Sequence, residues 1–193
     1  MHTYALTPVE PVITNAELAD WLGVDSTDSL LPMMAESATS AAIEYLQSEL
    51  ISRQRKVIYQ VWPSVGTDTS PSLSRNNVYI SNIIELPYSR LLSVEEVKQG
   101  GTDITDYTTL DTLPASLKLE SKTYSDDDEP AIEALYTAGY GAIADVPATI
   151  KMGVSQLAAY LYEHRGACAM SDALNTSGAA MTLAPYKTFV VML

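Results

Sequence analysis

The 193-residue sequence has little of what catalysis, disulfide bonding or membrane insertion requires. It contains one cysteine, Cys168, and two histidines, His2 and His164. A single cysteine excludes an internal disulfide and fits assembly in a reducing cytoplasm. No apolar run approaches the roughly 18 residues that span a membrane. The first twelve residues have neither the basic region nor the apolar segment of a signal peptide, so we expect no export signal and no membrane partner.

Positive charge is also scarce. Eleven Lys and Arg residues face 24 Asp and Glu residues, which gives a net charge of −13. Binding to nucleic acid by phosphate neutralisation needs clustered Lys and Arg, so we do not expect it. The only basic cluster, Arg53, Arg55 and Lys56, is predicted to lie at the C-terminal end of a helix, where cations complement the dipole. An acidic protein can still lie beside DNA without binding it, because like charges repel.

The remaining composition is that of a globular protein with a core. Hydrophobic residues make up 47% of the chain and charged residues only 18%, and this low charge hints at a surface partly covered by neighbours. Tyrosine is abundant, with 12 residues against one phenylalanine. Tyrosine has an apolar ring and a polar tip, which suits half-buried and interfacial positions.

Three segments have helical patterns. Thr14 and Glu17 form a capping-box pattern before a short helix that carries Leu18, Trp21 and Leu22 on one face and closes at Gly23. We expect Trp21 to be buried in the core. A second helix is predicted from about 29 to 52, with Pro32 in its first turn. A third is predicted to start at Pro147, capped by Asp145 or Val146, and to end near Arg165 and Gly166.

The middle of the chain has strand patterns instead. Runs rich in β-branched and aromatic residues, separated by turn residues, predict strands at 56–62, 77–80, 91–98, 107–110, 116–119 and 129–140, with a loop over 63–77. The fold class is therefore α+β: a bundle of about three helices with an inserted antiparallel β-sheet and an extended C-terminal tail. The expected divisions are an N-terminal arm (1–13), a helical core (14–55 and 142–166), a β-rich insertion (56–141), and a linker with a docking tail (167–193).

The candidate chemical groups do not form a site. Asp126–Glu129 lacks the ligand spacing of a calcium loop and is expected to be a solvated turn. Glu95 and Glu96 are consecutive in a predicted strand, so they point to opposite faces and cannot form an acid/base pair. A Cys168–His164 nucleophile would need a third, orienting group, and His164 is expected to cap a helix instead. We expect no catalysis, no metal and no cofactor.

Several ordered motifs resemble one structural family, the head–tail connector (head completion or adaptor) proteins of long-tailed bacteriophages. The motifs are Leu-Pro-x-x-x-Leu-x-Ser-Val at 86–94, Tyr-x-Ala-Gly-Tyr-Gly at 136–141, Val-Pro-Ala-x-Ile-Lys at 146–151, Tyr-Glu-x-Arg at 162–165 and Leu-Ala-Pro-Tyr at 183–186. The chain departs from the family at His164, where an asparagine is usual, and after Tyr186, where only Lys187 is basic.

The resemblance implies a structural virion protein of the capsid–tail neck, assembled in the host cytoplasm. Such proteins form a ring, commonly of twelve copies, under the portal protein; the ring extends the DNA channel, passes DNA without specific binding, and meets a tail-side neck or tail-completion protein. The motifs place the subunit or portal interface at Tyr162, Glu163, Arg165, Leu183, Ala184, Pro185 and Tyr186. Two alternatives stay open: a tail-completion protein on the tail side, and a small acidic Cys168/His164 enzyme.

Overall fold

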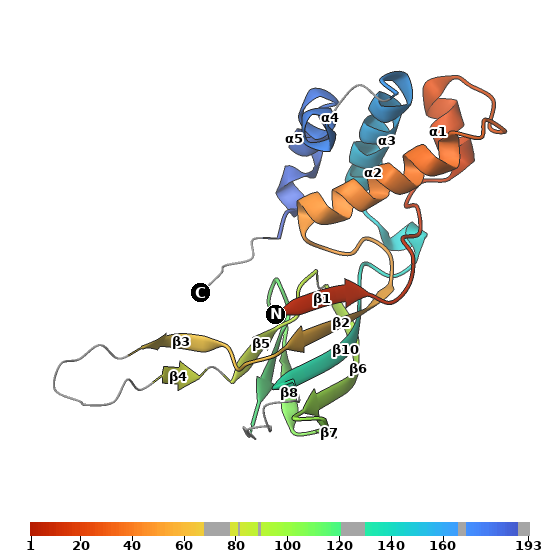
Figure 1. Ribbon diagram of the computed structural model, residues 1–193. Coiled ribbons are helices and arrows are strands. Elements are labelled where there is room, and N and C mark those ends of the chain that lie inside the picture. Colours follow the sequence, from red (N-terminus) through yellow and green to blue (C-terminus); the bar gives the residue numbers. More distant parts are fainter. Residues whose placement is uncertain (68–77, 81, 89, 121–129, 166–168, 189–193) are drawn as a thin grey trace.

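The computed structural model places five α-helices above a group of antiparallel strands (Figure 1), which confirms the α+β class. It describes residues 1–67, 78–80, 82–88, 90–120, 130–165 and 169–188. The α-helices form one unit, called here the helical unit, and the strands form the β unit. The sequence elements expected at Asp126–Glu129, at Cys168 and at 189–193 lie outside the described residues.

The helical unit is built from three stretches of the chain. Its elements are α1 (Asn15–Leu22), α2 (Leu31–Leu46), the 3₁₀ turn η1 (Ile143–Asp145), α3 (Ala148–Glu163), α4 (Met170–Thr176), α5 (Ala179–Leu183) and the 3₁₀ turn η2 (Ala184–Tyr186). Helices α2 and α3 pack against each other at the centre, with α1 on both of them and α4 and α5 against α3. Alanines such as Ala35, Ala38 and Ala42 are fully buried, so these helices approach closely.

The predicted start and end of α1 are confirmed. The Thr14 hydroxyl accepts the Glu17 backbone N–H at 3.2 Å, and the Glu17 carboxylate accepts the Thr14 N–H at 2.7 Å. Gly23 ends the helix with φ of 68°. The prediction that Trp21 is buried is wrong, because the side chain is 53% exposed. Buried Ala19 lies two residues earlier, about 200° around the helix, so Trp21 points away from the core.

Helix α2 ends at Leu46, earlier than the predicted residue 52. The predicted location of the basic cluster at the end of this helix is therefore wrong. Gln47 adopts the left-handed conformation with φ of 53° and stops the helix. Leu50 is nevertheless fully buried, because the turn after the helix folds it under the core. Strand β2 then begins at Arg53, so the basic cluster lies on a strand and not at a helix end.

The β unit contains three antiparallel sheets. The largest has the order β1-β2-β10-β6-β7 and consists of His2–Ala5, Arg53–Tyr59, Ile132–Ala138, Leu91–Gln99 and Thr102–Asp103. A three-stranded sheet has the order β5-β9-β8, from Ile83–Glu85, Ser116–Leu119 and Tyr107–Leu110. The third is a hairpin of β3 (Ser64–Thr67) and β4 (Val78–Ile80) that projects from the body (Figure 1).

Each segment predicted as a strand contains one: β8 and β9 have the predicted bounds, and the other predicted strands have shifted ends, while β1, β3, β5 and β7 were not expected. The N-terminal arm is extended, but residues 2–5 pair with β2 as an edge strand, His2 opposite Ile58 and Ala5 opposite Arg55. Residues 64–67, predicted as loop, form β3. These strands are two to four residues long, so too few residues alternate for the sequence pattern to be detected.

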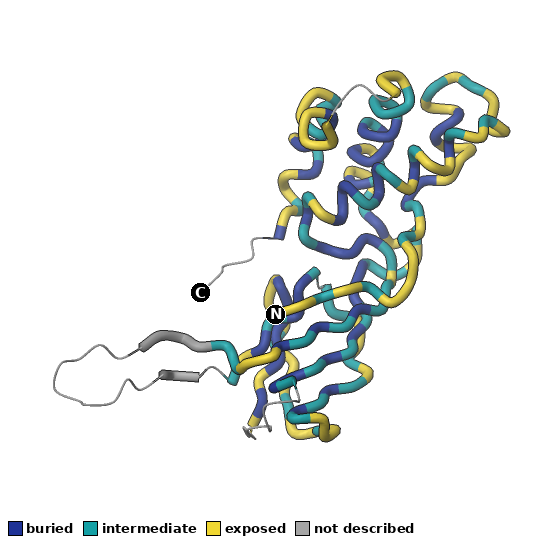
Figure 2. The backbone as a smooth tube through the Cα atoms, viewed as in Figure 1, coloured by how far each residue is buried: buried dark blue, intermediate teal, exposed yellow. Residues whose placement is uncertain are grey.

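The two units have separate cores (Figure 2). Strand β10 alternates between buried and half-buried residues, which confirms a strand with one face covered. Its buried residues, Ile132, Ala134, Tyr136 and Ala138, pack with Val57, Val97 and Leu117 in the β core. The helical core instead collects residues from α1 to α5, including Leu31, Leu46, Ile150 and Leu157.

The predicted extended tail is wrong for the described residues up to Thr188. Residues 170–186, expected as linker and tail, form α4, α5 and η2, and they pack on α3 because Ala173, Ala179 and Leu183 make a small apolar face that is fully buried. Gly153 on α3 makes room, since a Cβ there would lie 2.8 Å from the Leu183 side chain. The Thr188 N–H donates to the Leu46 carbonyl at 2.9 Å.

Candidate assembly surfaces

The residues predicted to form an interface fall into two groups. The first group is at the end of α3, where the Tyr162 hydroxyl donates to the Asp28 carboxylate at 2.5 Å. Arg165 lies over the Tyr162 ring, 4.3 Å from its centroid, and its Nε–H donates to the Tyr162 carbonyl at 2.9 Å. The Tyr162 hydroxyl and the Leu30 N–H lower the pKa of Asp28, while Asp28 raises the pKa of Tyr162. Glu163 is exposed beside them.

The second group, at the C-terminal segment, is only partly accessible. Leu183 is fully buried in the helical core, so this side chain is a packing residue in the folded chain. Ala184 and Pro185 are exposed, and Tyr186 is half-buried against the same core. Leu183 lies beside Gly153, ten residues before Glu163 on α3, a rise of about 15 Å. The structure therefore does not bring the two groups together.

A surface that the sequence did not indicate lies between the first group and the start of α2. It is a hollow of about 270 Å³, lined mainly by apolar side chains of α2, α3 and α4. Met33 is 53% exposed and Met170 is 38% exposed at this hollow. Methionine adapts its shape to its contacts, which favours its use at binding surfaces. The sequence signal was the Pro32-Met33-Met34 run, where Met33 is off the buried stripe of α2.

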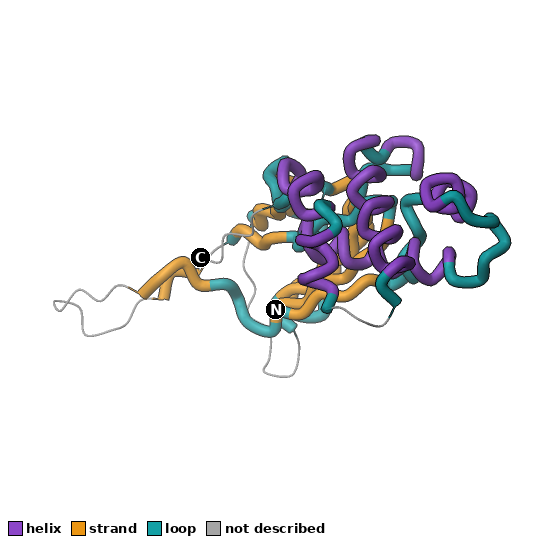
Figure 3. The backbone as a smooth tube through the Cα atoms, turned by 90° about the horizontal axis from the view of Figure 1, so that it is seen from above, coloured by secondary structure: helices purple, strands orange, loops and turns teal. Residues whose placement is uncertain are grey.

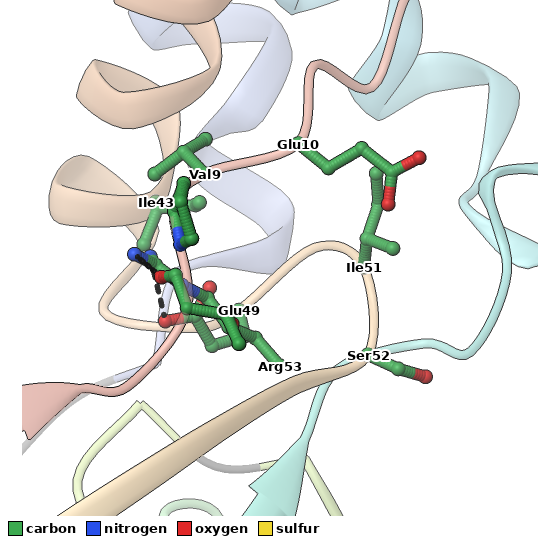
Figure 4. A pocket seen from close by; sticks show the side chains of 9 residues that line it. Val9, Glu10, Ile43, Glu49, Ile51, Ser52 and Arg53 are labelled. Atoms are coloured by element: carbon green, nitrogen blue, oxygen red, sulfur yellow. Dashed lines mark hydrogen bonds and ion pairs between the residues drawn. The ribbon is translucent and has the colours of Figure 1, made fainter.

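The connection between the two units is polar and tightly packed. Glu49, 1% exposed, accepts Arg55 in a short ion pair and Arg53 at 3.4 Å. Arg53 also donates to the Thr7 carbonyl at 2.8 Å, and the Arg55 guanidinium stacks 3.9 Å from the centre of the Tyr88 ring. The nearby pocket of about 270 Å³ is lined by Val9, Glu10, Ile43, Ile51 and Ser52 together with Glu49 and Arg53 (Figure 4).

The three residues of the basic cluster make ion pairs within the chain. Arg53 and Arg55 share the buried Glu49, and Lys56 pairs with Glu133 at 2.7 Å on the neighbouring strand. Two carboxylates therefore face three cations, so most of the positive charge of the cluster is compensated within the chain. The Glu133 carboxylate raises the pKa of Lys56, as expected for a retained ion pair.

The described side chains that were considered as catalytic groups make contacts within the fold. His164 follows the last residue of α3, where its ring stacks on Tyr160 with centroids 4.1 Å apart and its Nδ1–H donates to the Tyr160 carbonyl. His164 is therefore the helix cap that we predicted. Glu95 accepts from Ser93 and Thr137 at 2.6 Å, while Glu96 pairs with Lys98. Within the described ranges, no three His, Cys, Asp or Glu side chains are grouped as metal ligands, and no helix has the length and apolarity to cross a membrane.

Known proteins similar in fold are found only among solved structures. No family model and no curated protein matches the sequence. A chain in the neck of an empty gene transfer agent (GTA) particle, computed with C6 symmetry, matches with a TM-score of 0.74 and 18% identity. Chains in the virion of the native GTA particle and in its neck, computed with C12 symmetry, match with TM-scores of 0.70 and 0.71, both at 20% identity. Each match covers 100% of this chain and 98% of the other. The chain thus has the fold of a chain in these neck assemblies.

Proposed function

We propose that this chain is a structural component of the neck of a phage-like particle, where it joins the head to the tail. The observation that carries the proposal is the fold similarity, which extends over the whole chain and almost the whole of each neck chain. It includes the β unit as well as the helices. A shared helical bundle alone would be much weaker support, because one fold hosts many functions.

The finer proposal is an adaptor ring under the portal protein, with about twelve copies, that extends the DNA channel. The C12 symmetry of the similar neck structure supports this number. The net charge of −13 and the internally paired Arg53, Arg55 and Lys56 suit a channel through which DNA slides without sticking. The tail side of the ring would meet a tail-side neck or tail-completion protein.

Fractionation of the particles tests the adaptor role. Heads and tails would be purified separately from cells in which tail attachment is blocked, and each fraction would be probed for this chain. The adaptor role predicts the chain on DNA-filled heads and its absence from free tails. Finding it on tails alone would contradict the adaptor role and support the tail-completion alternative.

The proposed contact of the C-terminal segment with the portal or a neighbouring copy is tested by a deletion that leaves the buried core residues in place. Removing residues 181–193 would take away Leu183, which is fully buried, and would disturb folding. Removing 189–193 spares every described residue. If these five residues contact the portal or a neighbouring copy, the short deletion abolishes incorporation into heads while the free chain keeps the unfolding midpoint of the wild type. Normal infectious particles from this deletion would contradict the role.

A further inference from the structure

Strand β1 has one backbone edge that no described strand covers. It is the outermost strand of the five-stranded sheet and pairs with β2 alone. The Leu6 N–H, just after β1, donates to the Gln54 carbonyl at 3.0 Å. Alternate residues of an antiparallel strand bond to the same neighbour, so the backbone groups of Thr3 and Ala5 point to the open edge. The N-terminus, where β1 begins, lies at the margin of the strands in the front view and in the view from above (Figures 1 and 3).

The open edge of β1 lacks the features that usually prevent pairing with another chain. Natural edge strands are commonly blocked by charged residues, by proline or by a bulge. The strand His-Thr-Tyr-Ala contains no Lys, Arg, Asp, Glu or Pro, and its register with β2 has no shift. Tyr4 is 44% exposed, and Leu6 directly after the strand is 46% exposed. Strand β1 is therefore suited to pair with a further strand.

A second open edge belongs to β8 in the three-stranded sheet. Strand β8 pairs with β9 alone and without a register shift, and its sequence Tyr-Thr-Thr-Leu is also uncharged and free of proline. Just before β8, the Asp106 carbonyl accepts the N–H of Glu120, which follows β9, at 3.2 Å. By the same alternation, the backbone groups of Tyr107 and Thr109 point away from β9.

The open edge of β8 borders a groove of about 440 Å³. One side of the groove is made by β8 and the residue after it, and the other by the start of β6: Tyr107, Thr109, Leu110, Asp111 and residues 91–94. Strand β6 pairs with β7 only at Lys98 and Gln99, so no described strand pairs with 91–94 on the side away from β10. Leu92 is 51% exposed at the groove. The groove thus offers a strand edge and an apolar side chain.

We infer that β1 of one copy pairs with the open edge of β8 of the next copy, in the groove between β6 and β8. The pairing is antiparallel, as it is between all named strands of this chain. This inference rests on the proposed ring and assigns its subunit contact. Within one chain, β2, β10 and β6 lie between β1 and the groove, so the β1 that enters the groove comes from another copy.

A second copy fits the groove in length and in charge. Strands β1 and β8 are each four residues long, and each turns the backbone groups of two residues, spaced two apart, to its open edge. Copies with a net charge of −13 repel each other, and these two uncharged strands are places where they can approach. The two edges differ, as the contacts of a closed ring require.

Proline substitutions test the pairing on the purified chain mixed with the portal protein. Ala5→Pro and Thr109→Pro each remove one N–H from an open edge, where proline is tolerated. We expect the concentration for half-assembly to rise at least about tenfold, while the unfolding midpoint of the free chain stays that of the wild type. Ala5→Ser is the matched control, because it keeps the N–H, and it should assemble like the wild type. Wild-type assembly by either proline variant would overturn the inference.

Cross-linking gives an independent test that does not depend on affinity. In the pairing, the central residues Tyr4 and Thr108 form a non-hydrogen-bonded pair, with Cα atoms about 4.5 Å apart, which a disulfide can span. In a Cys168→Ser background, Tyr4→Cys combined with Thr108→Cys should give, on mild oxidation, a ladder of covalent dimers, trimers and larger species. Either cysteine alone should give no ladder. Complete rings without a ladder would overturn the inference and leave the proposed function standing.

A photo-activatable cross-linker on the cysteine of Thr108→Cys identifies the molecule that occupies the groove. Labelling of a second copy is the expected result. Labelling of the portal instead would assign the groove to the portal and overturn the pairing between copies. If the wild-type chain forms no ring at all, the proposed function fails and the inference fails with it.

Discussion

The helical unit and the β unit differ in which large side chains they bury and which they expose. In the β unit, Tyr59 and Tyr136 are buried and their hydroxyls donate to the carbonyls of Glu85 and Pro87. The helical unit keeps Trp21 exposed, together with the methionines at 33, 152, 170 and 181. The β unit exposes large side chains as well, at Val61, Leu92 and Leu113, but among the described residues these are mainly aliphatic, whereas those of the helical unit are a tryptophan and four methionines.

In the proposed neck role, this difference would assign assembly contacts to the helical unit, in addition to the strand pairing of the β unit. The exposed apolar side chains on α1, α2 and α4 lie on a bundle whose own core is filled by alanines together with leucine, isoleucine and valine side chains. The β unit has a well-paired sheet of five strands, and the helical unit is joined to it through the Glu49–Arg55–Tyr88 contacts. The predictions below test first the connection, then the β unit, then α1.

The largest effect on the free energy of unfolding is expected for a substitution of Gly139, which directly follows strand β10. A Cβ at this position would lie 2.5 Å from the Ile51 carbonyl oxygen, and its φ of 133° is unfavourable for other residues. Gly139→Val should lower the free energy of unfolding by about 4 kcal/mol. Gly23→Ala is the control, because it has a positive φ but no atom within 4 Å, and it should cost about 1 kcal/mol. Urea unfolding measures both; equal losses would contradict the account.

A smaller loss of unfolding free energy is expected when the buried carboxylate of Glu49, between the helical unit and the β unit, is removed. Glu49→Ala leaves Arg55, 6% exposed, without its charge partner, and should cost about 3 kcal/mol. The exposed Glu163→Ala should change the unfolding free energy by less than about 0.5 kcal/mol. Thermal unfolding of the two variants gives the comparison. A loss below about 1 kcal/mol for Glu49→Ala would show that the connection is held mainly by other contacts.

High pH should weaken the β unit through its buried tyrosines. Burial raises the pKa of Tyr136 to about 12, above the value near 10 of an unfolded tyrosine. The neutral form is therefore favoured in the fold, so its contribution is complete below pH 10 and is lost as the pH rises from 10 to 12. The loss is about 2 kcal/mol across this window. Tyr136→Phe should flatten the dependence of the unfolding free energy on pH; an unchanged slope would contradict this.

The smallest effect is expected at the capping box of α1, which positions Trp21. The Thr14 backbone N–H and hydroxyl lower the pKa of Glu17, so the stabilisation is present above the ordinary carboxyl pKa and is lost as the pH falls through the lowered one. Glu17→Gln should remove this acid-sensitive step. Thr14→Ala should cost about 1 kcal/mol at neutral pH. Circular dichroism during urea unfolding at pH 3 and pH 6 measures both; identical acid sensitivity in Glu17→Gln and wild type would count against the cap.

Local patterns predicted much of the fold. The Thr14–Glu17 cap, Gly23, Pro32 and the strand residues within 129–140 each act within a few residues, so the sequence predicted these features correctly. Features that depend on distant partners were not predictable. Trp21 fits the apolar stripe of an isolated helix, and only the packing of α1 on α2 and α3 leaves it exposed.

The same limit applies to the candidate site. The tail looked extended because residues 167–180 are small and polar, yet Ala173 and Ala179 are fully buried and Leu183 packs where Gly153 leaves space. The motif at 162–165 lies at the end of α3, where Arg165 lines the hollow, and its role as a subunit or portal interface stays a prediction. The hollow itself is made by three helices from different parts of the chain, so no single pattern in the sequence indicates it.

The central claim is that this chain assembles with the portal as a neck ring, and one mass measurement tests it most directly. The chain would be co-expressed with the portal protein of its own genome and examined by size-exclusion chromatography with light scattering. The account predicts one species whose mass fits a portal ring plus about twelve copies of this chain, the number set by the C12 symmetry of the similar neck. Separate elution of the portal and a monomeric chain would contradict it.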